Sequence, residues 1–259
     1  MAEAAQELAG RVALVTGSAR NIGRATMLEL ARAGAAVVVH GRTETEEARS
    51  AFAEAKAQGA RAILACGDIS REEEMAEVIR RAVGELGGLD IVVNNAALRK
   101  TTPFPKITLA EWRHIVGTAL DGAFITSMLA APHLIARAKS MPGTGRIFGI
   151  GGMTANKGAK GRAHVMATKA GLAGLMRGMA LDLAEHGITC NTVSVGSFDT
   201  ERKGSSSVVP NYQANLDIPL GRKGVPQDIA GVIRFLCGPA AAYITGQNIQ
   251  VNGGAWLGL

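Results

Sequence analysis

The sequence predicts an α/β protein of one domain, in which seven parallel strands form a doubly wound sheet. Short apolar runs rich in β-branched residues recur along the chain, longer stretches with helical periodicity separate them, and no linker, repeat or low-complexity tract divides the 259 residues. Near-continuous apolar strands joined by helices are typical of a parallel sheet that helices cover on both faces. The candidate strands are RVALVT, AAVVVH, RAILAC, DIVVNN, RIFGI, ITCNTVSV and NIQVN.

The composition favours a soluble cytoplasmic protein that binds a small anionic ligand. The net charge of +6 is scattered along the chain and aromatic residues make up only 4%, which argues against nucleic acid. Cys66, Cys190 and Cys237 lie far apart, so we expect free thiols in a reducing compartment and no metal site. The first ten residues lack the pattern of a signal peptide, and no apolar run reaches the roughly 18 residues of a membrane span.

Polar side chains mark the expected helix ends. Three pairs have the spacing of a capping box, in which two side chains satisfy the first amides of a helix: Thr43 with Glu46, Ser70 with Glu73, and Thr108 with Glu111. Pro226 suits a first helical turn and Gly238 the end of the same helix. Two long apolar helices are expected from Ala110 to about Arg137 and from His164 to about Glu185.

Residues 197–219 lack clear periodicity between two strong elements. An insertion of this length in a compact domain is typical of a functional lid or a disordered loop. We therefore expect one domain, residues 1–259, with a lid over its substrate cleft. Tyr212, one of only two tyrosines, lies in this lid and is a candidate to cover a substrate or to supply a phenol.

A glycine-containing loop, TGSARNIG, follows the first candidate strand and precedes the helical pattern RATMLELARAG. Such a turn lets backbone amides approach a pyrophosphate, whose charge the helix N-terminus also favours. The candidate cofactor-binding residues of this loop are Gly17, Ser18, Arg20, Asn21, Ile22 and Gly23. Asp68, after the third strand and before Ile69, could accept a hydrogen bond from an adenine amino group. The alternative is that the glycines only form a tight turn and Asp68 caps a loop.

The second strand ends in VVVHGRT, with no carboxylate to grip an unphosphorylated ribose. Gly41 leaves room there, and Arg42 with Arg20 could clamp a 2′-phosphate by charge-assisted hydrogen bonds. The cofactor that this pattern favours is therefore NADP(H) rather than NAD(H).

From residue 11 to about 254, the chain resembles the short-chain dehydrogenase/reductase family, whose fold is of the Rossmann type. TGSARNIG is similar to the family's TGxxxGxG loop with Asn21 at the middle glycine, and NNAA at residues 94–97 is similar to NNAG. The segment from PLGRKG to QVNGG is similar to the family's C-terminal signature almost throughout. The resemblance implies further cofactor contacts at Ile69, Asn95, Ala96, Lys169 and Thr200.

The resemblance also shows where this sequence departs from the family. In relatives a tyrosine four residues before a lysine transfers the proton, a serine polarises the carbonyl, and an asparagine holds a relay water. Lys169 matches the lysine, but Val165 stands at the tyrosine, Gly152 at the serine and Ala119 at the asparagine. None of these three replacements can donate a proton.

Other groups could still supply the proton or polarise a substrate. Lys169 is expected to bind the cofactor ribose and could also hold a water. His164 is the nearest group that titrates near neutral pH, although it points to a different face of the helix from Val165. Thr154 could replace the serine as a hydroxyl donor, or could instead bond its own backbone.

Three functions remain open at this point. The first is an NADP(H)-dependent oxidoreductase that reduces a carbonyl-like small molecule with a displaced proton donor. The second is an enzyme of the same fold that performs a non-redox or imine- or alkene-transforming step, and the third is a catalytically silent cofactor-binding subunit. Cations near the expected cleft suit an anionic substrate, although scattered surface charge is the alternative; they are Arg99, Lys100, Lys157, Lys160 and Arg162. The resemblance also implies a homotetramer.

Overall fold

The protein is described here from a computed structural model, which covers residues 6–200 and 217–258. Seven strands form one sheet in the order β3-β2-β1-β4-β5-β6-β7, and every neighbouring pair is parallel. The strands are β1 (Val12–Val15), β2 (Ala36–Gly41), β3 (Ala62–Cys66), β4 (Ile91–Asn94), β5 (Arg146–Ile150), β6 (Thr189–Val195) and β7 (Asn248–Val251). Each one falls within or overlaps a strand expected from the sequence, so the predicted doubly wound sheet is confirmed.

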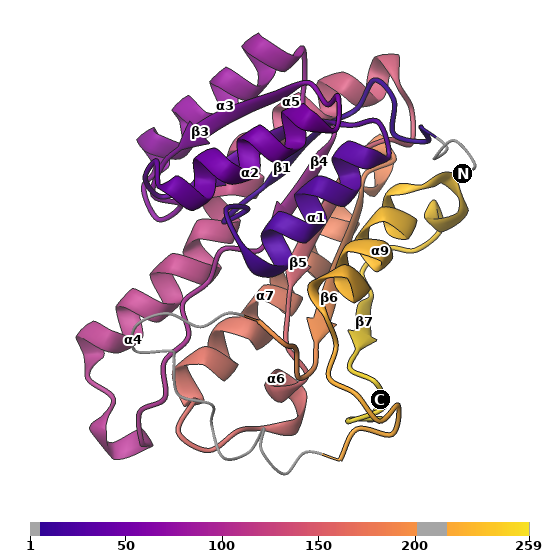
Figure 1. The fold of residues 1–259 in the computed structure, drawn as a ribbon. Coiled ribbons are helices and arrows are strands. Elements are labelled where there is room, and N and C mark those ends of the chain that lie inside the picture. Colours follow the sequence, from indigo (N-terminus) through magenta and orange to yellow (C-terminus); the bar gives the residue numbers. More distant parts are fainter. Residues whose placement is uncertain (1–5, 201–216, 259) are drawn as a thin grey trace.

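Helices cover both faces of the sheet (Figure 1). One face carries α1 (Asn21–Arg32), α2 (Glu46–Ala57) and α9 (Pro226–Cys237), while the other carries α3 (Glu72–Leu86), α5 (Gly122–Ser140) and α7 (Ala163–Asp182). Shorter pieces complete the described chain: η1 (Phe104–Lys106), α4 (Leu109–Val116), η2 (Gly117–Asp121), α6 (Thr154–Lys157), η3 (Ala184–His186) and η5 (Pro239–Ala241).

The core lies in two layers because side chains alternate along each strand. In β1, Ala13 and Val15 belong to the cluster beneath α1 and α9, whereas Val12 and Leu14 belong to the cluster beneath α3, α5 and α7. Both layers are almost entirely aliphatic, with Phe148 the one aromatic side chain among their fully buried members in the described part of the chain. The sheet is therefore a rigid support for the loops at its edges.

A buried carboxylate fixes one edge of the sheet. Asp90 is fully buried just before β4, where it accepts hydrogen bonds from the Val12 backbone amide at 2.8 Å and the Thr144 hydroxyl at 3.3 Å. Arg137, near the end of α5, donates to the same carboxylate at 3.1 Å. The Asp90 carboxylate thus joins β1, β4 and α5 at the N-terminal ends of the strands. The candidate active site lies at the opposite, C-terminal ends.

Two of the three predicted capping boxes are wrong. Thr45, not Thr43, caps α2 by accepting from the Ala48 amide at 3.3 Å. The Ser70 hydroxyl donates to Asp68 at 2.6 Å instead of capping α3, because a local turn competes for the same side chain. Thr108 does cap α4 and accepts from the Glu111 amide at 3.1 Å.

The first long apolar helix runs from Leu109 to Ser140 and contains a π-helical turn, Gly117–Asp121, that the sequence pattern did not predict. Its length and composition would allow it to cross a membrane. In the fold, however, residues such as Ala130 and Leu134 pack into the core beneath α3 and α7, which is typical of a core helix. Pro226 opens α9 and Gly238 ends it, as predicted.

Candidate active site

The loops that carry the predicted cofactor residues meet at one edge of the sheet. Strand order reverses between β1 and β4, since β2 and β3 extend the sheet on one side and β4 to β7 on the other. In open α/β sheets, ligands bind beyond the carboxyl ends of the strands at such a switch point. The loop after β1, the NNAA segment after β4 and the glycines after β5 all lie at this edge.

Two glycines are required by the shape of the loop after β1. Gly17 has φ +65°, a left-handed conformation that disfavours other residues. At Gly23, a Cβ atom would lie 2.4 Å from the carbonyl oxygen of Gly17 and 2.5 Å from the Asn95 side-chain nitrogen. A side chain at position 23 would therefore push this loop away from β4.

Asn21 explains the departure from the family's glycine pattern. It has φ +51° and is the one non-glycine residue with a positive φ in the described part of the chain. Asparagine is among the few residues that adopt this conformation at modest cost. The replacement of the middle glycine thus preserves the backbone path into α1.

His40, at the end of β2, forms hydrogen bonds with the glycine loop after β1. Its Nδ1 accepts a hydrogen bond from the Gly17 amide at 3.1 Å, and its own amide donates to the Ser18 hydroxyl at 2.8 Å. The Ser18 amide donates back to the His40 carbonyl at 2.9 Å. Burial lowers the pKa of His40 to about 4, so the ring stays neutral and can accept this bond. Sequence reasoning missed His40, and its position before Gly41 was the available signal.

Asn95 and Ala96 hold the loop from the side of β4. Their backbone amides donate to the Thr16 hydroxyl at 3.0 and 3.1 Å, and the Asn95 side chain donates to the carbonyl of Thr16 at 2.8 Å. Ile22 and Ile69 are buried, and Ile69 packs against Gly122. The predicted cofactor residues of this region are brought together, several of them as supports of the loop.

The groups predicted to select the cofactor lie at the ends of β2 and β3. Arg20 and Arg42 are exposed, and Arg42 is close enough to Asp68 to lower the pKa of that carboxyl. The larger cause of that lowering is the Ser70 side chain and amide, which donate to one oxygen of Asp68 at 2.6 and 3.0 Å. Asp68 therefore caps its own turn, and an adenine contact would have to use its second oxygen.

Lys169 points from α7 to the end of β5, where its ammonium group donates to the carbonyl of Ile150. Burial lowers its pKa to about 7, and repulsion from Arg99 and Arg162 adds to the effect. At neutral pH the side chain is therefore poised between its charged and neutral forms, which is the state a proton donor needs.

Gly152, which the resemblance sets at the family's serine position, has space for a side chain. A Cβ at Gly152 would meet only the Thr154 hydroxyl oxygen, at 3.9 Å, whereas one at Gly151 would clash with the Ser194 hydroxyl at 2.6 Å. Met153 is buried. Gly152 is thus the position after β5 that faces open space, and the Thr154 hydroxyl lies beside it.

Val165 and Ala119, which the resemblance sets at the tyrosine and asparagine positions, are apolar and buried. Val165 lies one turn before Lys169 in α7, and Ala119 lies in the π-helical turn η2. His164 is fully buried and faces α4, where its Nε2 lies 3.0 Å from a carboxylate oxygen of Glu111. Burial lowers the pKa of His164, while Glu111 opposes this shift. The ring is therefore directed at Glu111 and not at an open cleft.

The segment that the sequence analysis predicts to be a lid, residues 197–219, is described only at its two ends. The Asp199 amide donates to the Gly224 carbonyl at 2.8 Å, and the Gly224 amide donates to the Ser197 carbonyl at 3.0 Å. These bonds join the two ends beside β6, and Thr200 is the last described residue before the gap. Tyr212 lies outside the described residues, so its predicted role stays a prediction.

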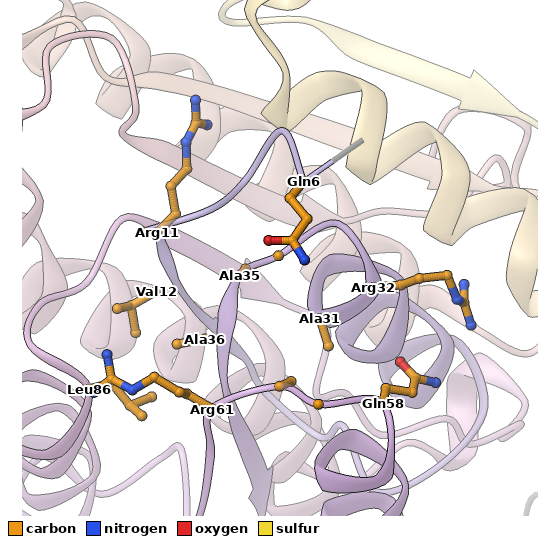
Figure 2. Close-up of a pocket in the computed structure, with 14 residues that line it drawn as sticks. Gln6, Arg11, Val12, Ala31, Arg32, Ala35, Ala36, Gln58, Arg61 and Leu86 are labelled. Carbon is orange, nitrogen blue, oxygen red and sulfur yellow. The ribbon is translucent and has the colours of Figure 1, made fainter. Parts of the chain in front are cut away.

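A hollow of about 220 Å³ lies at the opposite edge of the sheet (Figure 2). Val12 and Ala36 line it at the start of β1 and β2, together with Arg11, Arg32 and Arg61. Because it lies at the N-terminal ends of the strands, it is not at the position where this class of sheet binds a dinucleotide. Among the described residues, no group of three His, Cys, Asp or Glu side chains is arranged to hold a metal.

The glycine loop, the switch point and the lysine of α7 define a dinucleotide-binding protein of the oxidoreductase type. The family described as "Enoyl-(Acyl carrier protein) reductase" matches residues 17–255. The chain is 36% identical to a 3-oxoacyl-[acyl-carrier-protein] reductase of Synechocystis over 248 residues, 95% of this chain and 97% of the relative. It is 35% identical to the 3-oxoacyl-[acyl-carrier-protein] reductase of Staphylococcus aureus over 245 residues, 95% and 98% of the two chains.

Solved structures agree with this match. A dehydrogenase/reductase from Sinorhizobium meliloti superposes with a TM-score of 0.89 at 35% identity, over 98% of both chains. A short-chain dehydrogenase from Burkholderia cenocepacia, determined in complex with NADP, superposes with a TM-score of 0.87 at 30% identity, over 96% of this chain and 99% of that one. The chain belongs to the short-chain dehydrogenase/reductase family.

Proposed function

We propose that the protein is an NADP(H)-dependent oxidoreductase that reduces a carbonyl group of a small molecule. The observation that carries this proposal is the intact loop after β1, braced by His40 and Asn95, with Arg42 and no acidic residue at the end of β2. The neighbour solved with NADP and the relatives named 3-oxoacyl reductases support the same cofactor and a carbonyl substrate.

The cofactor would supply the hydride, and residues of this chain would hold it in place. The Gly17 and Ser18 amides are bonded to His40, so amides later in the loop, at the N-terminus of α1, would bind the pyrophosphate, and Arg42 with Arg20 would bind the 2′-phosphate. Lys169 would bind the ribose hydroxyls with its three donors. Gly23 lets the loop lie close to Asn95 after β4, and this close approach would bring the cofactor to the carbonyl site beside Lys169.

The family resemblance sets Val165 at the tyrosine position, so we propose that another group supplies the proton; Tyr212, outside the described residues, stays one candidate. Lys169, or a water that it holds, is the donor we favour, since its pKa of about 7 suits transfer at neutral pH. The Thr154 hydroxyl, beside Gly152, would polarise the carbonyl oxygen. His164 is buried against Glu111 and could act only after a change in side-chain position.

Consumption of NADPH with short 3-oxoacyl thioesters tests the proposal. We expect absorbance at 340 nm to fall with these substrates, faster with NADPH than with NADH, and deuterium to move from labelled NADPH to the product. Tight NADPH binding without turnover on any carbonyl substrate would contradict the proposal.

The apolar residues at Val165, Gly152 and Ala119 favour two alternative functions. One is an enzyme that performs a non-redox step or transforms an imine or alkene, and the other is a catalytically silent subunit. A redox-inert NADP analogue separates these cases. Activity that persists with the analogue identifies a non-redox step, while activity on imines or alkenes that needs NADPH identifies the second kind of reduction. Absence of both, with cofactor binding intact, identifies a silent subunit.

We also propose a homotetramer. The long helix Leu109–Ser140 presents Trp112, Phe124 and Met128 at the surface, and Tyr243 near the C-terminal end is fully exposed. Exposed aromatic and methionine side chains are typical of subunit interfaces. Light scattering on the purified protein measures the mass directly, and a mass of about 27 kDa, the chain's own 26.8 kDa, would exclude assembly.

A further inference from the structure

Glu111, in the first turn of α4, makes contact with two other segments through the two oxygens of its carboxylate. Its Oε2 accepts a hydrogen bond from the Lys100 ammonium group at 2.6 Å, and its Oε1 lies 3.0 Å from Nε2 of His164. Lys100 belongs to the loop after β4, and His164 is the second residue of α7. The carboxylate therefore bridges the loop after β4 and the start of α7.

The contact between Glu111 and His164 is shielded from water. His164 is fully buried, and the Glu111 side chain is only 12% exposed. Neither Oε1 nor Nε2 has a hydrogen-bond partner elsewhere in the described part of the chain. Separating two buried polar groups that have only each other costs free energy. This pair therefore holds α4 against α7 more firmly than an exposed ion pair would.

A backbone hydrogen bond joins the same loop to the turn before α7. The Thr102 amide donates to the Gly161 carbonyl at 2.8 Å. Gly161 has φ +72° and Gly158, at the start of this turn, has φ +85°. Two glycines give the turn wide conformational freedom in themselves. The start of α7 therefore depends on contacts such as the Glu111 bridge to stay in one place.

Both of the joined segments lead into the candidate active site. The loop after β4 begins at Asn95, whose side chain and amide bond to Thr16 and so support the glycine loop. Helix α7 carries Lys169 little more than one turn after His164. The bridge thus lies between the support of the cofactor loop and the helix that presents Lys169.

We propose that Glu111 is a positioning residue, whose bridge from Lys100 to His164 fixes where Lys169 stands relative to the cofactor and to the substrate carbonyl. This inference rests on the proposed reductase function. Misplacement of reacting groups by about 1 Å can lower a rate by about 10²-fold. Loss of the bridge should therefore affect the reaction and the choice of substrate, while cofactor binding stays intact.

The variants Glu111→Ala and Lys100→Met each break the bridge. We expect kcat/KM for ketone reduction to fall about tenfold or more in Glu111→Ala and about threefold in Lys100→Met, with NADPH affinity unchanged. Lys100→Arg keeps the cation and should retain most of the rate. Since Glu111→Ala leaves a buried histidine without its contact and could fail to fold, Lys100→Met, at a half-exposed position, carries the test on its own.

Two ketones of different bulk separate positioning from a general weakening of the fold. Ethyl acetoacetate and ethyl 3-oxo-3-phenylpropanoate differ in the group beside the reacting carbonyl. A purely structural loss lowers both rates by the same factor, whereas a displaced Lys169 changes their ratio. We expect the ratio of the two kcat/KM values to change about threefold or more in both bridge variants.

The matched control is Glu77→Ala, which removes an exposed carboxylate that is paired with Arg80 on α3. It should leave the rates and their ratio as in the wild type. An unchanged ratio in Lys100→Met, or the same change in Glu77→Ala, would overturn the proposal.

Hydrogen–deuterium exchange without substrate keeps this proposal separate from the reductase function. Faster exchange in residues 98–103 and 158–164 of Lys100→Met, but not of Glu77→Ala, supports the bridge even if no ketone is reduced. The Thr102 amide reports most directly, because it donates across the two segments. Unchanged exchange in both segments would overturn the bridge while the reductase function stands.

Discussion

Removal of the Thr154 hydroxyl should reduce turnover under the proposed function, in which this oxygen takes the part of the serine that the family resemblance implies at Gly152. A Cβ built at Gly152 lies 3.9 Å from Thr154 Oγ1, and nothing else lies within 4 Å of it. A hydroxyl at either position would therefore lie in the same region, and we expect either one to reach the carbonyl oxygen of the substrate. One hydrogen-bond donor aimed at a developing negative charge contributes about 10²- to 10³-fold in kcat, or about 2.7–4 kcal/mol. We use the lower end, because Thr154 is partly exposed to water.

The variant Thr154→Val is thus expected to lower kcat about 10²-fold, with little change in the affinity for NADPH. Steady-state oxidation of NADPH with a saturating ketone measures the effect. Thr154→Ser keeps the hydroxyl and should retain most of the rate. Adding Gly152→Ser to Thr154→Val should restore it, whereas adding Gly152→Ala, which supplies the Cβ alone, should not.

The reasoning is refuted if Thr154→Val turns over at the wild-type rate, or if the serine and alanine at position 152 act alike in the Thr154→Val background. Thermal unfolding of all variants serves as the control. Thr154 makes no side-chain hydrogen bond among those of the described residues, and Gly152 has open space, so the melting temperature should change little.

Three further outcomes are expected. The pKa of His40 is about 4 in the fold against an ordinary 6.5, so the unfolded state gains a proton before the folded state as the pH falls. The free energy of unfolding, measured in urea titrations, should therefore drop by about 3 kcal/mol between pH 6.5 and 4. The variant His40→Gln keeps an acceptor for the Gly17 amide and should reduce this dependence on pH. Arg42→Gln should weaken NADPH binding about tenfold or more and leave NADH unchanged; an equal loss for both cofactors would show that it does not contact the 2′-phosphate. Arg137→Met should lower the free energy of unfolding by about 3 kcal/mol or more, because it leaves the Asp90 carboxylate buried without its cation. A loss below about 1 kcal/mol in denaturant melts would contradict this.

The sheet could be predicted from the sequence because its signal is local. A strand buried on both faces must be apolar throughout, and a parallel neighbour requires a helix between, so runs such as AAVVVH define both the element and its connection. Gly17 was predictable for the same reason, because the turn itself imposes its φ of +65°. Gly23 is required by its close approach to Asn95, which is a long-range contact.

The parts of the site that depend on tertiary contacts could not be predicted. The bond from Gly17 to His40 joins residues 23 positions apart, and nothing in the pattern around His40 indicates its direction. His164 was a candidate proton donor on sequence grounds, yet its surroundings depend on where α4 lies against α7. Capping at Thr43 and Ser70 failed because neighbouring side chains offered competing hydrogen bonds.

The open space at Gly152 also has a pharmacological meaning. The family pattern implies a serine at this position in typical members, and that side chain would fill the volume that is empty here. An inhibitor with a methyl or halogen substituent directed at Gly152 would fit this protein and collide with the hydroxymethyl group of such relatives. Under the proposed function, the absence of a side chain at Gly152 would then become a basis for chemical selectivity.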